Sequence, residues 1–110
     1  MPRTLLTDFE LMIVIAILRV GDEAYGVQIA RDIETTVGRR VMIGAAYAAL
    51  DRLERNGLVI SRIGDPTPER GGRAKRYFHV TRRGVVAARE TQRALVTMWT
   101  DVPQLKAKHP

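Results

Sequence analysis

Hydrophobic residues first recur with helical spacing between residues 8 and 19. They form one stripe at intervals of three and four residues, and they also cover much of the opposite side. A helix that is apolar nearly all round is buried on more than one side, and in a chain of 110 residues we expect the second side to meet another chain. Thr7 and Glu10 have the spacing of a capping box at the start of this helix, and Gly21 stands just after its end.

Two further amphipathic helices are predicted. The second covers residues 24–36, where apolar residues recur at every fourth position and Gly38 offers a left-handed end. The third covers residues 43–56 and ends at Asn56-Gly57. Its inner face is expected to hold Ile43, Leu50 and Leu53 together with Ala46 or Tyr47.

Beyond the third helix the pattern becomes that of strands. Residues 58–63 and 76–80 are short runs rich in β-branched or aromatic residues, and the segment between them holds two prolines and three glycines. We therefore expect a hairpin with a long loop, after which Thr81 can cap a last helix that continues to about Thr100. This order predicts a mainly α fold with a small β-hairpin, the winged helix-turn-helix arrangement, followed by a C-terminal dimerisation helix.

The last helix is the candidate for self-association. We expect residues 1–80 to form the winged helix-turn-helix region, residues 81–103 the dimerisation helix of the same compact domain, and residues 104–110 a tail. The seam of this helix has heptad spacing and consists of Val85, Ala88, Gln92, Leu95, Trp99 and Val102. The first helix would add Leu11, Ile15 and Leu18. An amphipathic helix packed on its own domain gives nearly the same pattern and is the alternative.

The charge of the chain is unevenly distributed. The formal net charge is +6; residues 1–60 hold seven arginines and eight acidic residues, whereas residues 61–110 hold eleven lysines and arginines and four acidic residues. A local excess of positive charge is typical of a surface that binds a polyanion such as double-stranded DNA. A basic surface that serves only solubility is the alternative.

Two segments are candidates for contact with DNA. In a helix-turn-helix the second helix lies in the major groove, which makes the outward side of the third helix the reading surface. Contacts are expected there from Gly44, Ala45, Tyr47, Ala48 and Arg52, with Arg39 and Arg40 just before the helix. The hairpin loop carries cations around the Gly71-Gly72 tip, and phosphate or minor-groove contacts are expected from Arg70, Arg73, Lys75 and Arg76. A solvated face is the alternative for either segment.

Other classes of protein are not expected. The chain has no cysteine, which excludes disulfides and thiolate metal sites and suits a reducing cytoplasm. Ser61, His79 and His109 form no catalytic or metal-binding spacing, so we expect neither an enzyme nor a cofactor. The longest apolar run, residues 11–18, has eight residues where a membrane span needs ~20, and no signal peptide is recognised. A cytoplasmic protein without membrane contact is therefore expected.

These segments together resemble the PadR family of bacterial transcriptional regulators over about residues 5–100. The matching segments are Tyr25-Gly26-Val27-Gln28-Ile29 in the second helix, Gly44 to Val59 in the third helix and its exit, Gly71-Gly72-Arg73 and Lys75-Arg76-Tyr77-Phe78 in the hairpin, and Val80-Thr81 with Gly84 at the last helix. The resemblance implies a homodimeric protein of the repressor type, whose last helix builds the dimer together with the first.

The third helix departs from the pattern of that family. Members commonly carry a serine- or proline-containing start and a Thr-Leu-Tyr-Pro core. In their places this chain has Met42, Ala45, Ala46 and Ala48, and only Tyr47 matches. Some short members bind flat aromatic effectors between their last helices, near a tryptophan. Trp99 lies about one turn further from Gly84 than the resemblance would place that tryptophan. Whether this chain binds a small-molecule effector is therefore left open. We expect sequence-specific DNA binding that represses transcription; a winged-helix protein-interaction module is the alternative.

Overall fold

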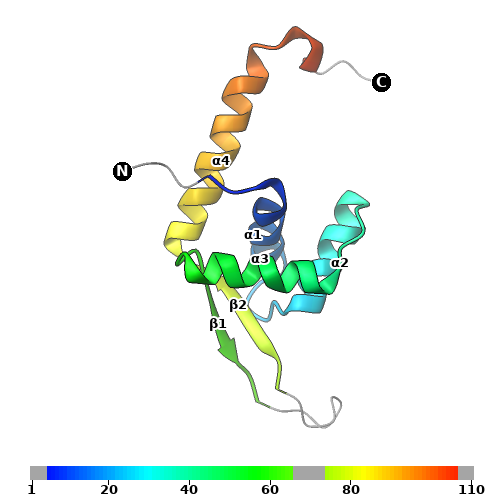
Figure 1. Ribbon diagram of the computed structural model, residues 1–110, viewed down its shortest axis with the longest axis vertical. Coiled ribbons are helices and arrows are strands. Elements are labelled where there is room, and N and C mark those ends of the chain that lie inside the picture. Colours follow the sequence, from blue (N-terminus) through cyan, green and yellow to red (C-terminus); the bar gives the residue numbers. More distant parts are fainter. Residues whose placement is uncertain (1–4, 66–73, 107–110) are drawn as a thin grey trace.

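A computed structural model describes residues 5–65 and 74–106 of the chain (Figure 1). Three helices come first, an antiparallel hairpin follows, and a long helix comes after it. The elements are α1 (Asp8–Val20), α2 (Gly26–Val37), α3 (Ile43–Arg55), β1 (Val59–Ile63), β2 (Arg76–Val80), α4 (Arg82–Thr100) and the short 3-10 helix η2 (Pro103–Leu105). The predicted mainly α fold with a small hairpin is confirmed, and the second predicted strand coincides with β2.

The predicted helix caps are present. Thr7 Oγ1 accepts a hydrogen bond from the backbone N–H of Glu10 at 3.1 Å, and the Glu10 carboxylate accepts one from the N–H of Thr7 at 2.9 Å. α2 ends at Gly38, whose φ of 76° lies in the left-handed region that glycine adopts readily. Thr81 caps α4 by accepting from the N–H of Gly84 at 3.1 Å. These ends form where predicted because each cap needs only residues a few positions apart.

The start of α2 was predicted two residues too early. The carbonyl of Ala24 accepts a hydrogen bond from the N–H of Phe78 at 2.8 Å, and Tyr25 forms an isolated antiparallel bridge with Tyr77. Tyr25 has extended backbone, so the helix begins only at Gly26. Pairing with β2 supplies these backbone groups with partners, and it joins the hairpin directly to the start of α2.

The core lies where α1, α2 and α3 meet the hairpin and the first half of α4. Its largest fully buried side chains are Phe78, Ile13, Ile29, Ile33, Leu50, Leu53, Leu58, Val14 and Val59. α3 contributes Ala46 and Ala49 besides its two leucines. The prediction that Ile43 faces the core is wrong, since its side chain is 45 % exposed. Ile43 is the first residue of α3, and the buried side of the helix begins one turn later, at Ala46.

The first half of α4 packs against the body of the molecule. Close contact is possible at Gly84, where a Cβ atom would overlap the carbonyl oxygen of Leu58. Ala87 and Thr91 continue the buried side. Thr91 Oγ1 accepts from the N–H of Leu6 at 2.9 Å and donates to the carbonyl of Ala87 at 2.7 Å. The segment before α1 is thereby tied to α4.

The second half of α4 projects away from the body (Figure 1) and leaves apolar side chains uncovered. Of the residues predicted for dimerisation, the exposed ones are Ile15, Leu18, Gln92, Leu95, Trp99 and Val102, and the half-buried ones are Leu11, Val85 and Ala88. The chain turns after α4, where the Trp99 indole N–H donates to the carbonyl of Leu105 at 2.8 Å. The sequence predicted only a tail from residue 104, so η2 is an addition to the prediction.

Candidate nucleic-acid interface

The outward side of α3 is lined by small residues. Gly44, Ala45 and Ala48 are exposed, as predicted from their spacing, and a Cβ atom built on Gly44 would meet no atom within 4 Å. Between residues 44 and 48 this side carries no large side chain, so the helix can approach another surface closely there. The major groove of B-DNA is wide enough to admit such a helix.

Tyr47 lies on a different side of α3. It is half-buried, its ring is 6.5 Å from that of Phe78, and a Cβ atom on Gly26 would lie 2.5 Å from its hydroxyl. The ring therefore packs α3 against the start of α2 and against β2. The DNA contact expected of Tyr47 stays a prediction.

Two arginines of the predicted reading surface are paired with carboxylates of α1. Arg39 lies 3.5 Å from Asp8, and Arg52 lies 3.3 Å from Glu10. Burial raises the pKa of Glu10, but hydrogen bonds from the Thr7 backbone and from the Arg52 side chain outweigh burial and hold that pKa below its usual value. The charge of both arginines is thus partly compensated within the chain.

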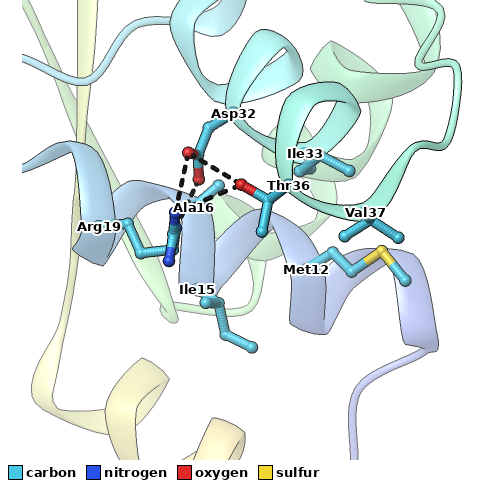
Figure 2. Close-up of a pocket in the computed structure, with 8 residues that line it drawn as sticks. All are labelled: Met12, Ile15, Ala16, Arg19, Asp32, Ile33, Thr36 and Val37. Carbon is cyan, nitrogen blue, oxygen red and sulfur yellow. Dashed lines mark hydrogen bonds and ion pairs between the residues drawn. The ribbon is translucent and has the colours of Figure 1, made fainter.

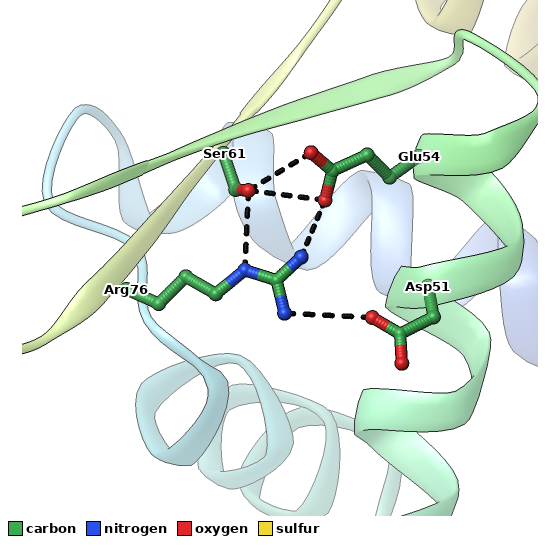
Figure 3. Close-up of polar contacts among 4 residues, drawn as sticks. All are labelled: Asp51, Glu54, Ser61 and Arg76. Atoms are coloured by element: carbon green, nitrogen blue, oxygen red, sulfur yellow. Dashed lines mark hydrogen bonds and ion pairs between the residues drawn. The ribbon is translucent and has the colours of Figure 1, made fainter.

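Arg76 is placed differently from the phosphate contact that the sequence suggested. Figure 3 shows its guanidinium reaching from β2 towards α3, where it bonds Glu54 at 2.5 Å and Asp51 at 3.4 Å. Its Nε also donates to Ser61 Oγ at 3.1 Å, and that hydroxyl donates to the Glu54 carboxylate at 2.9 Å. Together with Arg55 these charged residues line an open hollow of about 390 Å³ between α3 and the hairpin. Arg76 therefore fastens the hairpin to α3.

Two cations flank a pair of aromatic rings at the base of the hairpin. Lys75 Nζ lies 4.6 Å from the centre of the Tyr25 ring, and the Arg62 guanidinium lies 4.6 Å from the centre of the Tyr77 ring. The two rings meet edge to face at 6.2 Å. A cation over a ring face is attracted by the quadrupole of the ring and keeps its full charge. These contacts therefore fix Lys75 and Arg62 in position without neutralising their charges.

Arg62 was not among the predicted DNA contacts. The signal that could have found it is the pairing of the two predicted strands, which places Arg62 beside Tyr77. In the hairpin register Arg62 lies directly opposite Tyr77, and directly opposed residues of an antiparallel pair share one face. Among the other expected contacts, Arg40 is exposed, whereas Arg70 and Arg73 lie outside the described residues.

A second hollow, of about 100 Å³, lies between α1 and α2 (Figure 2). Its apolar lining consists of Met12, Ile15, Ala16, Ile33 and Val37. The Arg19–Asp32 ion pair, at 2.9 Å, borders it together with Thr36, and the hydrogen bond and charge of Asp32 raise the pKa of Arg19. Drug-sized ligands usually occupy pockets of about 300–1,000 Å³, so this hollow gives no support to an effector site.

Within residues 5–65 and 74–106, no cluster of three or more His, Cys, Asp or Glu side chains could hold a metal ion. Within the same ranges, no helix combines the length and apolar character that crossing a membrane requires.

Comparisons with known proteins agree on one fold. Residues 14–90 match the transcriptional regulator PadR-like family. A transcriptional regulator from Clostridium thermocellum is similar with a TM-score of 0.73 and 20% identity, over 89% of this chain and 92% of that one. A PadR-like regulator from Bacillus cereus has a TM-score of 0.70 and 21% identity over 91% and 93%, and a PadR family regulator from Eggerthella lenta has 0.69 and 20% over 86% and 80%. No curated protein matches the chain.

Proposed function

Since the chain belongs to the PadR-like family of transcriptional regulators, we propose that it binds double-stranded DNA sequence-specifically as a homodimer and represses transcription. The observation that carries this proposal is the exposed small-residue side of α3, which lies beside a hairpin whose base holds two cations stacked on aromatic rings. In this proposal α3 enters the major groove and the hairpin follows the adjacent backbone.

The pairing of the basic residues divides them into two groups. Arg39, Arg52 and Arg76 are paired with carboxylates and serve mainly to position α3 and the hairpin. Four other cations of α3, its approach and the hairpin are exposed or ring-stacked, form no ion pair with another described residue and can meet phosphates: Arg40, Arg55, Arg62 and Lys75. The minor-groove role of Arg70 and Arg73 rests on the sequence alone.

The dimer is supported by apolar side chains that one chain leaves exposed. Leu95 and Trp99 of α4 are each 55 % exposed, and Ile15 and Leu18 of α1 are 44 % and 53 % exposed. Burying such side chains in a partner is favourable because apolar surface leaves water. A two-fold axis through α4 would present two copies of α3 to two half-sites on DNA.

A fluorescence titration against random duplex DNA at several salt concentrations tests DNA binding. Six neutralised phosphates would give a log–log salt slope of roughly −5, and Arg62→Ala should make it shallower by about 0.9 for each phosphate that Arg62 neutralises in the parent complex. Arg93→Ala is the matched control, since Arg93 lies on α4 and pairs with Glu90. A salt-independent signal, or no binding, would favour the protein-interaction module instead.

Repression has a separate test. Sites selected from a random duplex library are placed beside a promoter, and transcription is measured in vitro with and without the protein. We expect transcription to fall as the site is occupied, and a rise would show an activator.

A further inference from the structure

Two large apolar side chains stand exposed at the start of α3. Met42 is 63 % exposed and Ile43 is 45 % exposed, although Ile43 begins a helix whose inner side is well packed and Met42 directly precedes it. The fold does not need them for its core, because the buried side of α3 is completed by Ala46, Ala49, Leu50 and Leu53.

Stabilisation of the helix does not explain the methionine at position 42 either. It occupies the N-cap position of α3, where its side chain makes no capping hydrogen bond. Serine, threonine, aspartate and asparagine are preferred at this position because their oxygen atoms accept from the free N–H groups of the first turn. A methionine there gives up that stabilisation, so helix capping does not account for Met42.

The neighbours of this pair leave it prominent. Gly44 has open space around it, and Ala45 and Ala48 are exposed but small. Met42 and Ile43 are therefore the large exposed side chains at the N-terminal end of α3, the end of a recognition helix that contacts base edges. Arg40, two positions before Met42, is exposed and places positive charge beside them.

We infer that Met42 and Ile43 read thymine in the major groove by apolar contact with its C5-methyl group, an inference that rests on the proposed DNA binding. The major groove displays hydrogen-bonding groups of all four bases, and the thymine methyl is the apolar group that distinguishes a base there. Residues at the N-terminal end of a recognition helix are the ones that contact base edges. An aliphatic side chain has no hydrogen bond to offer and a thioether is only a weak acceptor, which makes the methyl group their best complement.

Replacing thymine by deoxyuridine in the selected site removes only the methyl group and tests this directly. The unmodified protein should lose affinity by about fourfold for each contacted thymine, the ratio that corresponds to exposing one methyl-sized group. Two symmetric contacts would give about fifteenfold by the same ratio. Met42→Ala and Ile43→Ala should bind the thymine site more weakly and should discriminate less between thymine and deoxyuridine.

Val86→Ala is the matched control, because Val86 is 49 % exposed on α4 and should leave discrimination unchanged. Equal affinity of the unmodified protein for thymine and deoxyuridine sites would overturn the inference while leaving DNA binding intact. A change of sedimentation in Met42→Ala or Ile43→Ala, without an effect of deoxyuridine, would instead assign this surface to a second copy of the chain and would likewise overturn it. Failure to bind any duplex would refute the proposed function itself.

Discussion

Replacing Arg76 by alanine distinguishes an arginine that binds phosphate from one that fastens the hairpin. Its contact with Glu54 is 2.5 Å long, and the two side chains are 35 % and 33 % exposed. A hydrogen bond to a charged group contributes about 1.5–3 kcal/mol, and at this exposure solvent screening reduces the coupling to about 1 kcal/mol. The contact with Asp51 adds little, because Asp51 is 57 % exposed.

The measurement is a double-mutant cycle in urea with Arg76→Ala, Glu54→Gln and the combination. We expect Arg76→Ala to lower the free energy of unfolding by about 1–2 kcal/mol, and the double variant to lose about 1 kcal/mol less than the sum of the single variants. Additivity within about 0.3 kcal/mol would refute the structural role of this contact. Arg93→Ala is the control, since Arg93 is 62 % exposed in its pair with Glu90 and its removal should change stability by less than about 0.5 kcal/mol.

DNA affinity gives the second readout. Without Arg76, the carboxylates of Asp51 and Glu54 stand uncompensated beside the proposed DNA-facing side of α3, so affinity should fall through repulsion. Glu54→Gln in the Arg76→Ala background should then restore part of the affinity. If Arg76 simply bound a phosphate, Arg76→Ala would instead make the salt slope shallower by about 0.9 per contact, and Glu54→Gln would restore no DNA affinity.

Three further outcomes are expected. Gly84→Ala should destabilise the fold by about 1–3 kcal/mol in thermal melts because its Cβ has no room, whereas Gly44→Ala, in open space on a helix, should stabilise it slightly. Glu10→Gln keeps the capping geometry but loses the charge. Since the folded-state pKa of Glu10 is lowered, the variant should be less stable than the parent in urea at pH 7. The difference in stability should vanish as the pH falls through that pKa. Leu95→Asp should sediment at 12.3 kDa at micromolar concentration while the parent sediments at twice that mass; a parent that is already monomeric contradicts the proposed dimer.

The placement of the predicted DNA contacts shows where sequence reasoning stops. The exposed side of α3, with Gly44, Ala45 and Ala48, follows from a period of 3.6 residues and was predicted. The same period predicted Ile43 on the inner face, which is wrong, because the period gives the side of the helix on which a residue lies but not how far along the helix a neighbouring element covers that side. Arg76 was expected to face DNA because it belongs to a run of cations in the sequence. That Asp51 and Glu54 lie beside it in space cannot be read from the sequence.

Local interactions fixed the element order, the Thr7–Glu10 capping box, the Thr81 cap and the strand at residues 76–80, since each depends on residues only a few positions apart. The tertiary structure alone decided which charges are neutralised. Arg76 meets Glu54 across 22 positions, and Arg52 meets Glu10 across 42. It also drew Tyr25 out of the predicted helix and into pairing with Tyr77. Such contacts join elements that periodicity treats separately, because a side chain's partner depends on how the elements pack in space and not on its neighbours along the chain.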